Sequence, residues 1–160
     1  MRTILIVLAL VVFTFCGLHA QTPGVKYAGS VTDADLNVYH TISIGTQEWI
    51  AENLKTTRFN DNTIIPLVTD GTAWDVLTTP GFCWYDNDSL TYGSDYGALY
   101  NWYAVNNGKL CPAGWKVPSH DDWEKLAQCI SNQKGPYDKD DYGAWENVGG
   151  HLKATNGYYD

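Results

Sequence analysis

The sequence predicts an α+β domain built from short strands and two or three helices. Residues 38–44 alternate between two sets of side chains, as a strand does. A helix-start signal at Ser119 is followed by apolar residues at helical spacing. Short strands mixed with a few helices favour the α+β class.

The first 20 residues have the pattern of a signal peptide. Arg2 supplies a positive charge, and the apolar run 4–15 is shorter than the roughly 20 residues of a membrane span. Ala20 is a small residue at the cleavage position, so Gln21 is expected at the mature N-terminus. Cys16 raises the alternative of a lipoprotein, but the Phe before it is unsuited to the lipoprotein peptidase. We expect a secreted or surface-exposed protein that is not inserted in the membrane after cleavage.

The mature chain is expected to be one acidic domain, with a linker at 21–32 and the domain at 33–160. Arg2 leaves with the signal, so nine basic residues (10 − 1) face 18 acidic ones, a formal charge of −9. Nucleic acids and anionic lipids require basic patches, so this balance argues against both as partners.

Several further elements are predicted along the chain. In the strand 38–44, one face carries Val38, His40, Ile42 and Ile44, and the other carries Tyr39, Thr41 and Ser43. The remaining expectations are a strand at 48–54, a hairpin tip at 59–66, a short helix at 70–77, a strand at 82–85, a helix at 96–105 and a loop at 131–146.

The helix that follows Ser119 is the best-defined element. The Ser119 hydroxyl caps it, and Asp122 is placed to reach back in a variant of the capping box. One apolar stripe follows, formed by Trp123, Leu126, Ala127 and Ile130. We also expect Trp102, Trp115 and Trp123 to pack against each other, because large aromatic side chains are usually core residues.

Four sequence blocks occur in an order that resembles one known family. They are IGTQEWIAENLK (44–55), FCWYDND (82–88), YGALYNWYAV (96–105) and LCPAGWKVPSHDDWEKL (110–126). Together they resemble the Fibrobacter succinogenes major paralogous domain. The resemblance implies a C-type-lectin-like fold, related to the formylglycine-generating enzyme domain, with a small twisted antiparallel sheet, flanking helices and long irregular loops. It also implies an incomplete domain, because family members continue past a segment like 149–153 into a Gly-, Trp- and Ser-rich half.

Two oxygen-rich segments are candidate calcium sites. Residues 33–37 (DADLN) resemble the start of a calcium loop, but Leu36 replaces the Gly that family members usually carry, so an Asx-turn is favoured. Asp86 and Asp88 are the better metal candidates, although a solvated turn is the favoured interpretation there too. The sequence implies no other cofactor.

Three cysteines remain after signal cleavage, and an exported chain is expected to oxidise them where geometry permits. The sequence does not assign pairs, and an odd number leaves one thiol unpaired. The resemblance makes Cys83 and Cys111 the disulfide candidates, because both lie inside family blocks, whereas Cys129 lies on the helix after Ser119.

The leading functional hypothesis is a non-catalytic binding module for carbohydrate or a surface protein, with a role in adhesion. The mature chain keeps seven Trp and 11 Tyr, side chains that stack on sugars or peptides. The candidate ligand site comprises Trp84, Tyr85, Asp86 and Asp88. One alternative is an enzyme of the formylglycine-generating type, which needs a copper-binding Cys pair. The other is a purely structural component of a secreted assembly.

Overall fold

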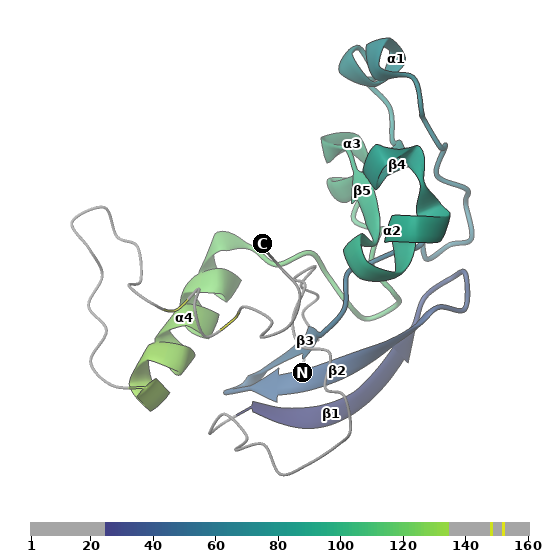
Figure 1. The fold of residues 1–160 in the computed structure, drawn as a ribbon. Coiled ribbons are helices and arrows are strands. Elements are labelled where there is room, and N and C mark those ends of the chain that lie inside the picture. Colours follow the sequence, from purple (N-terminus) through teal and green to yellow (C-terminus); the bar gives the residue numbers. More distant parts are fainter. Residues whose placement is uncertain (1–24, 135–147, 149–151, 153–160) are drawn as a thin grey trace, which may run out of the picture.

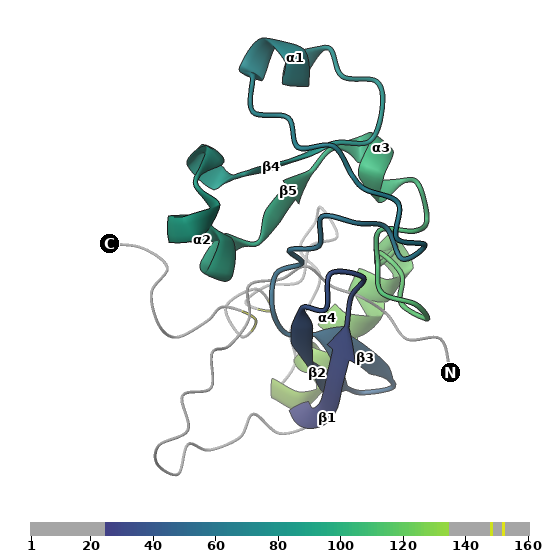
Figure 2. The ribbon, with the colours of Figure 1, turned by 90° about the vertical axis from the view of Figure 1, so that its right-hand side faces the viewer.

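The computed structural model describes residues 25–134, 148 and 152 (Figure 1). Its elements are β1 (Val25–Thr32), β2 (Val38–Ile44), β3 (Gln47–Ile50), α1 (Gly71–Asp75), β4 (Phe82–Trp84), the 3-10 turn η1 (Tyr85–Asn87), α2 (Ser89–Tyr96), β5 (Ala98–Tyr100), α3 (Trp102–Val105) and α4 (His120–Lys134). Figures 1 and 2 place β1–β3 with α4 at one end and β4, β5 and α1–α3 at the other. The α+β class and the antiparallel pairing are confirmed.

The first sheet is antiparallel in the order β1-β2-β3. β2 has the predicted bounds, and a turn at Gly45 (φ 61°) leads into β3. β3 stops at Ile50, before the predicted end at residue 54. The carboxylate of Glu52 accepts the backbone N–H of His40 at 2.7 Å, in the place of a strand carbonyl, so the ladder ends there.

The linker predicted for 21–32 is wrong from residue 25 onward, because residues 25–32 form β1. β1 pairs with β2 from Val25↔Ile44 to Thr32↔Val38. The register shifts between Tyr27 and Gly29, where Gly29 adopts φ 148°. Most β1 side chains from residue 26 on are exposed, so the strand depends on backbone pairing and leaves little hydrophobic periodicity in the sequence.

The two faces of β2 contribute to two different cores. Tyr39, on one face, joins Ile50 in a central core that also contains Phe82, Ala98 and Cys111. Ile44, on the opposite face, belongs to a second core, called here the helix core, together with Trp49 of β3 and Leu126 and Ile130 of α4. The predicted division of β2 into two faces is therefore confirmed.

Helix α4 begins where the sequence predicts. The Ser119 hydroxyl donates to Oδ2 of Asp122 at 2.8 Å, and the Ser119 backbone N–H donates to the same oxygen at 2.9 Å. The predicted apolar stripe faces β2 and β3, and the rings of Trp49 and Trp123 lie 5.5 Å apart. α4 continues to Lys134, so the loop predicted for 131–146 is wrong at residues 131–134, and the rest of that prediction lies outside the described residues.

The second sheet consists of β4 and β5, paired from Phe82↔Tyr100 to Trp84↔Ala98. The predicted hairpin tip at 59–66 is confirmed, because the Phe59 N–H donates to the Thr63 carbonyl at 2.9 Å. The short helix predicted at 70–77 is present as α1, and Asp70 caps it by accepting the Ala73 N–H at 2.8 Å.

The single helix predicted at 96–105 is wrong, since β5 and α3 occupy that range. Gly97 (φ 67°) ends α2, and the side chain of Asn101 accepts the Ala104 N–H at 3.0 Å to start α3. The apolar residues of this range have helical spacing, but Gly97 ends one helix and Asn101 caps the start of the next, so no single helix forms.

The predicted mutual packing of Trp102, Trp115 and Trp123 is also wrong. Trp102 is 67% exposed, Trp115 packs on the central core and Trp123 packs on the helix core. Separately, none of the helices in the described ranges is long and apolar enough to cross a bilayer.

Candidate functional site

A cleft of about 370 Å³ lies between the β1–β2 turn, the segment that follows β3, and α2. Its lining residues are Asp35, Asn37, Lys55, Thr57, Trp84, Gly93 and Ser94. Ligand sites are usually concave and combine an aromatic surface with a few fixed polar groups. This cleft has both.

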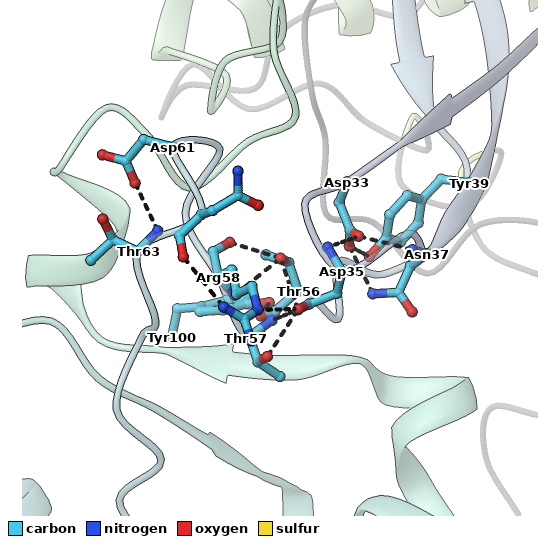
Figure 3. A network of polar contacts seen from close by, with 11 residues as sticks. Asp33, Asp35, Asn37, Tyr39, Thr56, Thr57, Arg58, Asp61, Thr63 and Tyr100 are labelled. Atoms are coloured by element: carbon cyan, nitrogen blue, oxygen red, sulfur yellow. Dashed lines mark hydrogen bonds and ion pairs between the residues drawn. The ribbon is translucent and has the colours of Figure 1, made fainter.

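The first wall of the cleft is the turn 33–37. Oδ1 of Asp33 accepts the backbone N–H groups of Asp35 and Asn37, each at 2.9 Å (Figure 3). Leu36 adopts φ 66°, a left-handed conformation that is easiest for Gly. The favoured Asx-turn interpretation of this segment is confirmed, because the Asp33 carboxylate binds its own turn.

Asp35 fastens that turn to the segment 56–58. Its Oδ2 accepts the backbone N–H of Thr57 at 2.5 Å and the Thr57 hydroxyl at 2.9 Å, and Arg58 Nε donates to Oδ1 at 3.1 Å (Figure 3). Burial alone would raise the pKa of Asp35, but the hydrogen bonds from Thr57 and Thr56 and the charge of Arg58 outweigh it and lower the pKa. The carboxylate is therefore ionised, and the positive charge of Arg58 offsets its negative charge.

The second wall is formed by Trp84 and α2. The indole of Trp84 meets Phe82 edge-on, with ring centroids 5.7 Å apart. Gly93 lies against the same indole, since a Cβ there would come within 3.3 Å of Trp84 Cζ3. Two sides of the half-buried indole are thus held, which fixes its orientation at the cleft.

The polar groups of the cleft mostly present acceptors. The Thr57 hydroxyl donates to Asp35, and the Ser94 hydroxyl donates to Asp95 at 3.1 Å. Asn37 donates through Nδ2 to Asp33 at 2.8 Å, and within residues 25–134 its Oδ1 has no partner. Hydroxyl and amide oxygens with their donors already engaged suit a ligand rich in O–H groups.

Only Trp84 among the predicted ligand residues lines the cleft. Tyr85 packs with two residues of α2, its ring 5.1 Å from both Tyr92 and Tyr96. Asp88 caps α2, because its Oδ1 accepts the backbone N–H groups of residues 90 and 91. Asp86 is an exposed residue of η1 with φ 54°.

The predicted calcium site at Asp86 and Asp88 gains no support from this geometry, because helix capping occupies Oδ1 of Asp88. Among residues 25–134, 148 and 152, no three His, Cys, Asp or Glu side chains are grouped as metal ligands.

Neither of the two disulfide candidates, Cys83 and Cys111, forms a disulfide in the structure. Cys111 is a buried member of the central core, and burial raises its pKa to about 12. Burial also raises the pKa of Cys83. Neither thiol is activated for nucleophilic or redox chemistry, which requires a lowered pKa.

Sequence reasoning missed most of the cleft. Thr57 and Ser94 lie outside every sequence motif, Lys55 ends the family block 44–55 without a predicted role, and the sequence predicted only a calcium loop or a turn for Asp35 and Asn37. The Asx-turn at Asp33 was the sequence feature that could have indicated the cleft, because a turn held by hydrogen bonds to a carboxylate fixes the positions of the neighbouring side chains.

The fold and the cleft together define a small α+β domain with a polar cleft beside a fixed tryptophan. The family model described as Fibrobacter succinogenes major domain (Fib_succ_major) matches residues 42–160, and the chain belongs to this family. β1 and the turn 33–37 precede the matched range but are part of the same sheet and cleft. No curated protein and no solved structure matches the chain.

Proposed function

We propose that this protein is an exported, non-catalytic module that binds carbohydrate in the cleft beside Trp84. The observation that carries the proposal is the oriented indole of Trp84 in a cleft whose lining also includes an Asn, a Thr, a Ser and a Lys residue. Sugars combine apolar C–H faces, which stack on aromatic rings, with hydroxyls that need fixed polar partners.

A binding role without catalysis agrees with the state of the groups in the cleft. Within the described part of the chain, the one carboxylate that lines the cleft is that of Asp35, which is held by Thr57 and Arg58 and has a lowered pKa. A general acid or base works best with a pKa near the operating pH, so Asp35 is unsuited to that role.

The proposal includes export through the signal peptide at 1–20 and a C-type-lectin-like arrangement of the domain. Short antiparallel sheets and the long stretch of irregular backbone between β3 and β4 agree with that arrangement. The position of the cleft beside the irregular segments also agrees, because loops on a rigid scaffold often carry binding sites.

A glycan array probed with the mature chain tests the proposal. We expect Trp84→Phe to weaken every binding signal by about tenfold, since the smaller ring loses stacking area but keeps the contact with Phe82. Trp102→Phe is the matched control, because Trp102 is 67% exposed and lies outside the cleft.

The melting temperature of both variants reports whether the fold is intact. If the chain bound none of the glycans on the array, the proposal would be contradicted. Glycan binding that is lost in Trp102→Phe and kept in Trp84→Phe would contradict it as well.

A further inference from the structure

The cleft contains one negatively and one positively charged side chain, and the negative one is already paired with a residue outside the lining. Among the described residues, Asp35 and Lys55 are the ionisable side chains in the lining of the cleft. Asp35 already has a counter-ion, because Arg58 Nε donates to its Oδ1 at 3.1 Å, and Thr57 saturates its Oδ2. The charge of Lys55 is therefore the one that a ligand would meet.

Lys55 is held in place through its backbone and free at its side-chain end. Its N–H donates to the hydroxyl of Tyr39 at 3.0 Å, and that hydroxyl donates to the buried Asp33 at 2.6 Å. No carboxylate in the described part of the chain pairs with its ammonium. By contrast, Lys109 and Lys116 are paired with acidic partners at 2.8 and 2.5 Å.

Two acidic neighbours of the cleft are already engaged. Asp33 is 7% exposed and accepts from Tyr39 and from its own turn. Asp95 accepts the Ser94 hydroxyl at 3.1 Å, and it is exposed and not part of the lining. Lys26 and Lys125 also form no ion pair within the described residues, but neither lines the cleft, so Lys55 is the unpaired lysine that a ligand in the cleft would meet.

We propose that the cleft selects acidic saccharides, with Lys55 binding a carboxylate or sulfate group of the sugar whose ring stacks on Trp84. This inference rests on the carbohydrate-binding function proposed above. An ammonium and an anionic oxygen form a charge-assisted hydrogen bond, which is stronger than a neutral one. Uncharged sugars leave the ammonium without a partner and bind more weakly.

Calorimetric titration with ligand pairs that differ only in charge tests the proposal. The pairs are galacturonate and mannuronate trisaccharides with their methyl esters, and a galactose trisaccharide with and without sulfate. We expect the charged member of at least one pair to bind about tenfold more tightly. The uronate and sulfate pairs identify which anion is preferred.

Lys55→Met keeps the apolar stem and removes the charge. It should abolish the difference within the preferred pair and leave the binding of the uncharged member within about twofold of the unmodified chain. Lys125→Met on α4, outside the cleft, makes the same charge change and should leave the difference unchanged.

Equal affinities within every pair would overturn the selection of acidic saccharides while carbohydrate binding stands. Binding of neither member of any pair would remove both proposals. Weakening of both members alike by Lys55→Met would show a role in positioning the cleft, and would also overturn the proposed charge recognition.

Discussion

The hydroxyl of Tyr39 donates a 2.6 Å hydrogen bond to Oδ2 of Asp33, and both side chains are buried. The same hydroxyl accepts the backbone N–H of Lys55 at 3.0 Å. Burial raises the pKa of Tyr39, and the hydrogen bond to Asp33 raises it further, so the phenol stays protonated and keeps donating. One hydroxyl thus joins β2, the turn 33–37 and the wall of the cleft.

Tyr39→Phe is expected to destabilise the protein by about 2 kcal/mol, because it removes the donor to a buried carboxylate and leaves a backbone N–H unpaired. Urea unfolding measures the change. Tyr27→Phe is the control, since Tyr27 is 67% exposed on β1, and it should change stability by less than about 0.5 kcal/mol. Equal effects of the two variants would contradict the proposed role of the Tyr39 hydroxyl.

Gly97→Ala is expected to cost about 3 kcal/mol or more. Gly97 has φ 67°, and a Cβ there would lie 2.5 Å from the carbonyl oxygen of Leu54, which accepts the Ala98 N–H. Gly108→Ala is the matched control: its φ is 77°, but a Cβ there meets nothing within 4 Å. It should cost about 1 kcal/mol from the backbone conformation alone.

Thermal and urea unfolding of both glycine variants separate the two contributions. If Gly97→Ala cost no more than Gly108→Ala, the close approach of Leu54 to residue 97 would be wrong.

Leu36→Gly is expected to stabilise the chain by about 0.5 kcal/mol. Leu36 holds φ 66° and is 79% exposed, so it suffers left-handed strain without contributing burial. Glycine relieves that strain, although its greater freedom in the unfolded chain offsets part of the gain. Leu36→Ala keeps the Cβ and should give no such gain in urea unfolding. Destabilisation by Leu36→Gly would show that the leucine side chain has a structural role.

The carboxylate of Asp122 should make the stability of α4 depend on pH. Burial alone would raise the pKa of Asp122, but hydrogen bonds from Lys116 and Ser119 outweigh it and hold the pKa at about 2. A free Asp has a pKa of about 3.9, so the stabilisation is complete above about pH 4 and is lost as the pH falls toward about 2.

The comparison of Asp122→Asn with the unmodified chain measures this contribution. We expect a stability difference on the order of 2 kcal/mol at pH 6 that shrinks between about pH 4 and pH 2. Asp121→Asn, an exposed neighbour in the same first turn, should show a smaller and flatter difference. A pH-independent difference for Asp122→Asn would count against the shifted pKa.

Elements encoded by neighbouring residues were predictable. The cap at Ser119 and the apolar stripe of α4 lie within a dozen positions, and β2 shows its two faces within seven residues. The Asx-turn at Asp33 is local for the same reason. Each prediction rests on contacts whose partners are close in sequence.

The elements that were mispredicted depend on partners elsewhere in the chain. β1 is a strand because β2 pairs with it, and little in its own exposed side chains reports this. Residues 98–100 become β5 instead of helix because β4 pairs with them, and because Gly97 must pass close to the carbonyl of Leu54.

The sequence by itself determined the α+β class, the family, the Asx-turn at Asp33 and the start of α4. Only the tertiary structure decided which of the aromatic and polar residues form a site. The cleft joins the turn 33–37, Lys55, Trp84 and the Gly93 face of α2, which are separated by up to about 60 positions. Such a constellation depends on packing in the central core and on the Tyr39 hydroxyl, and neither leaves a local pattern in the sequence.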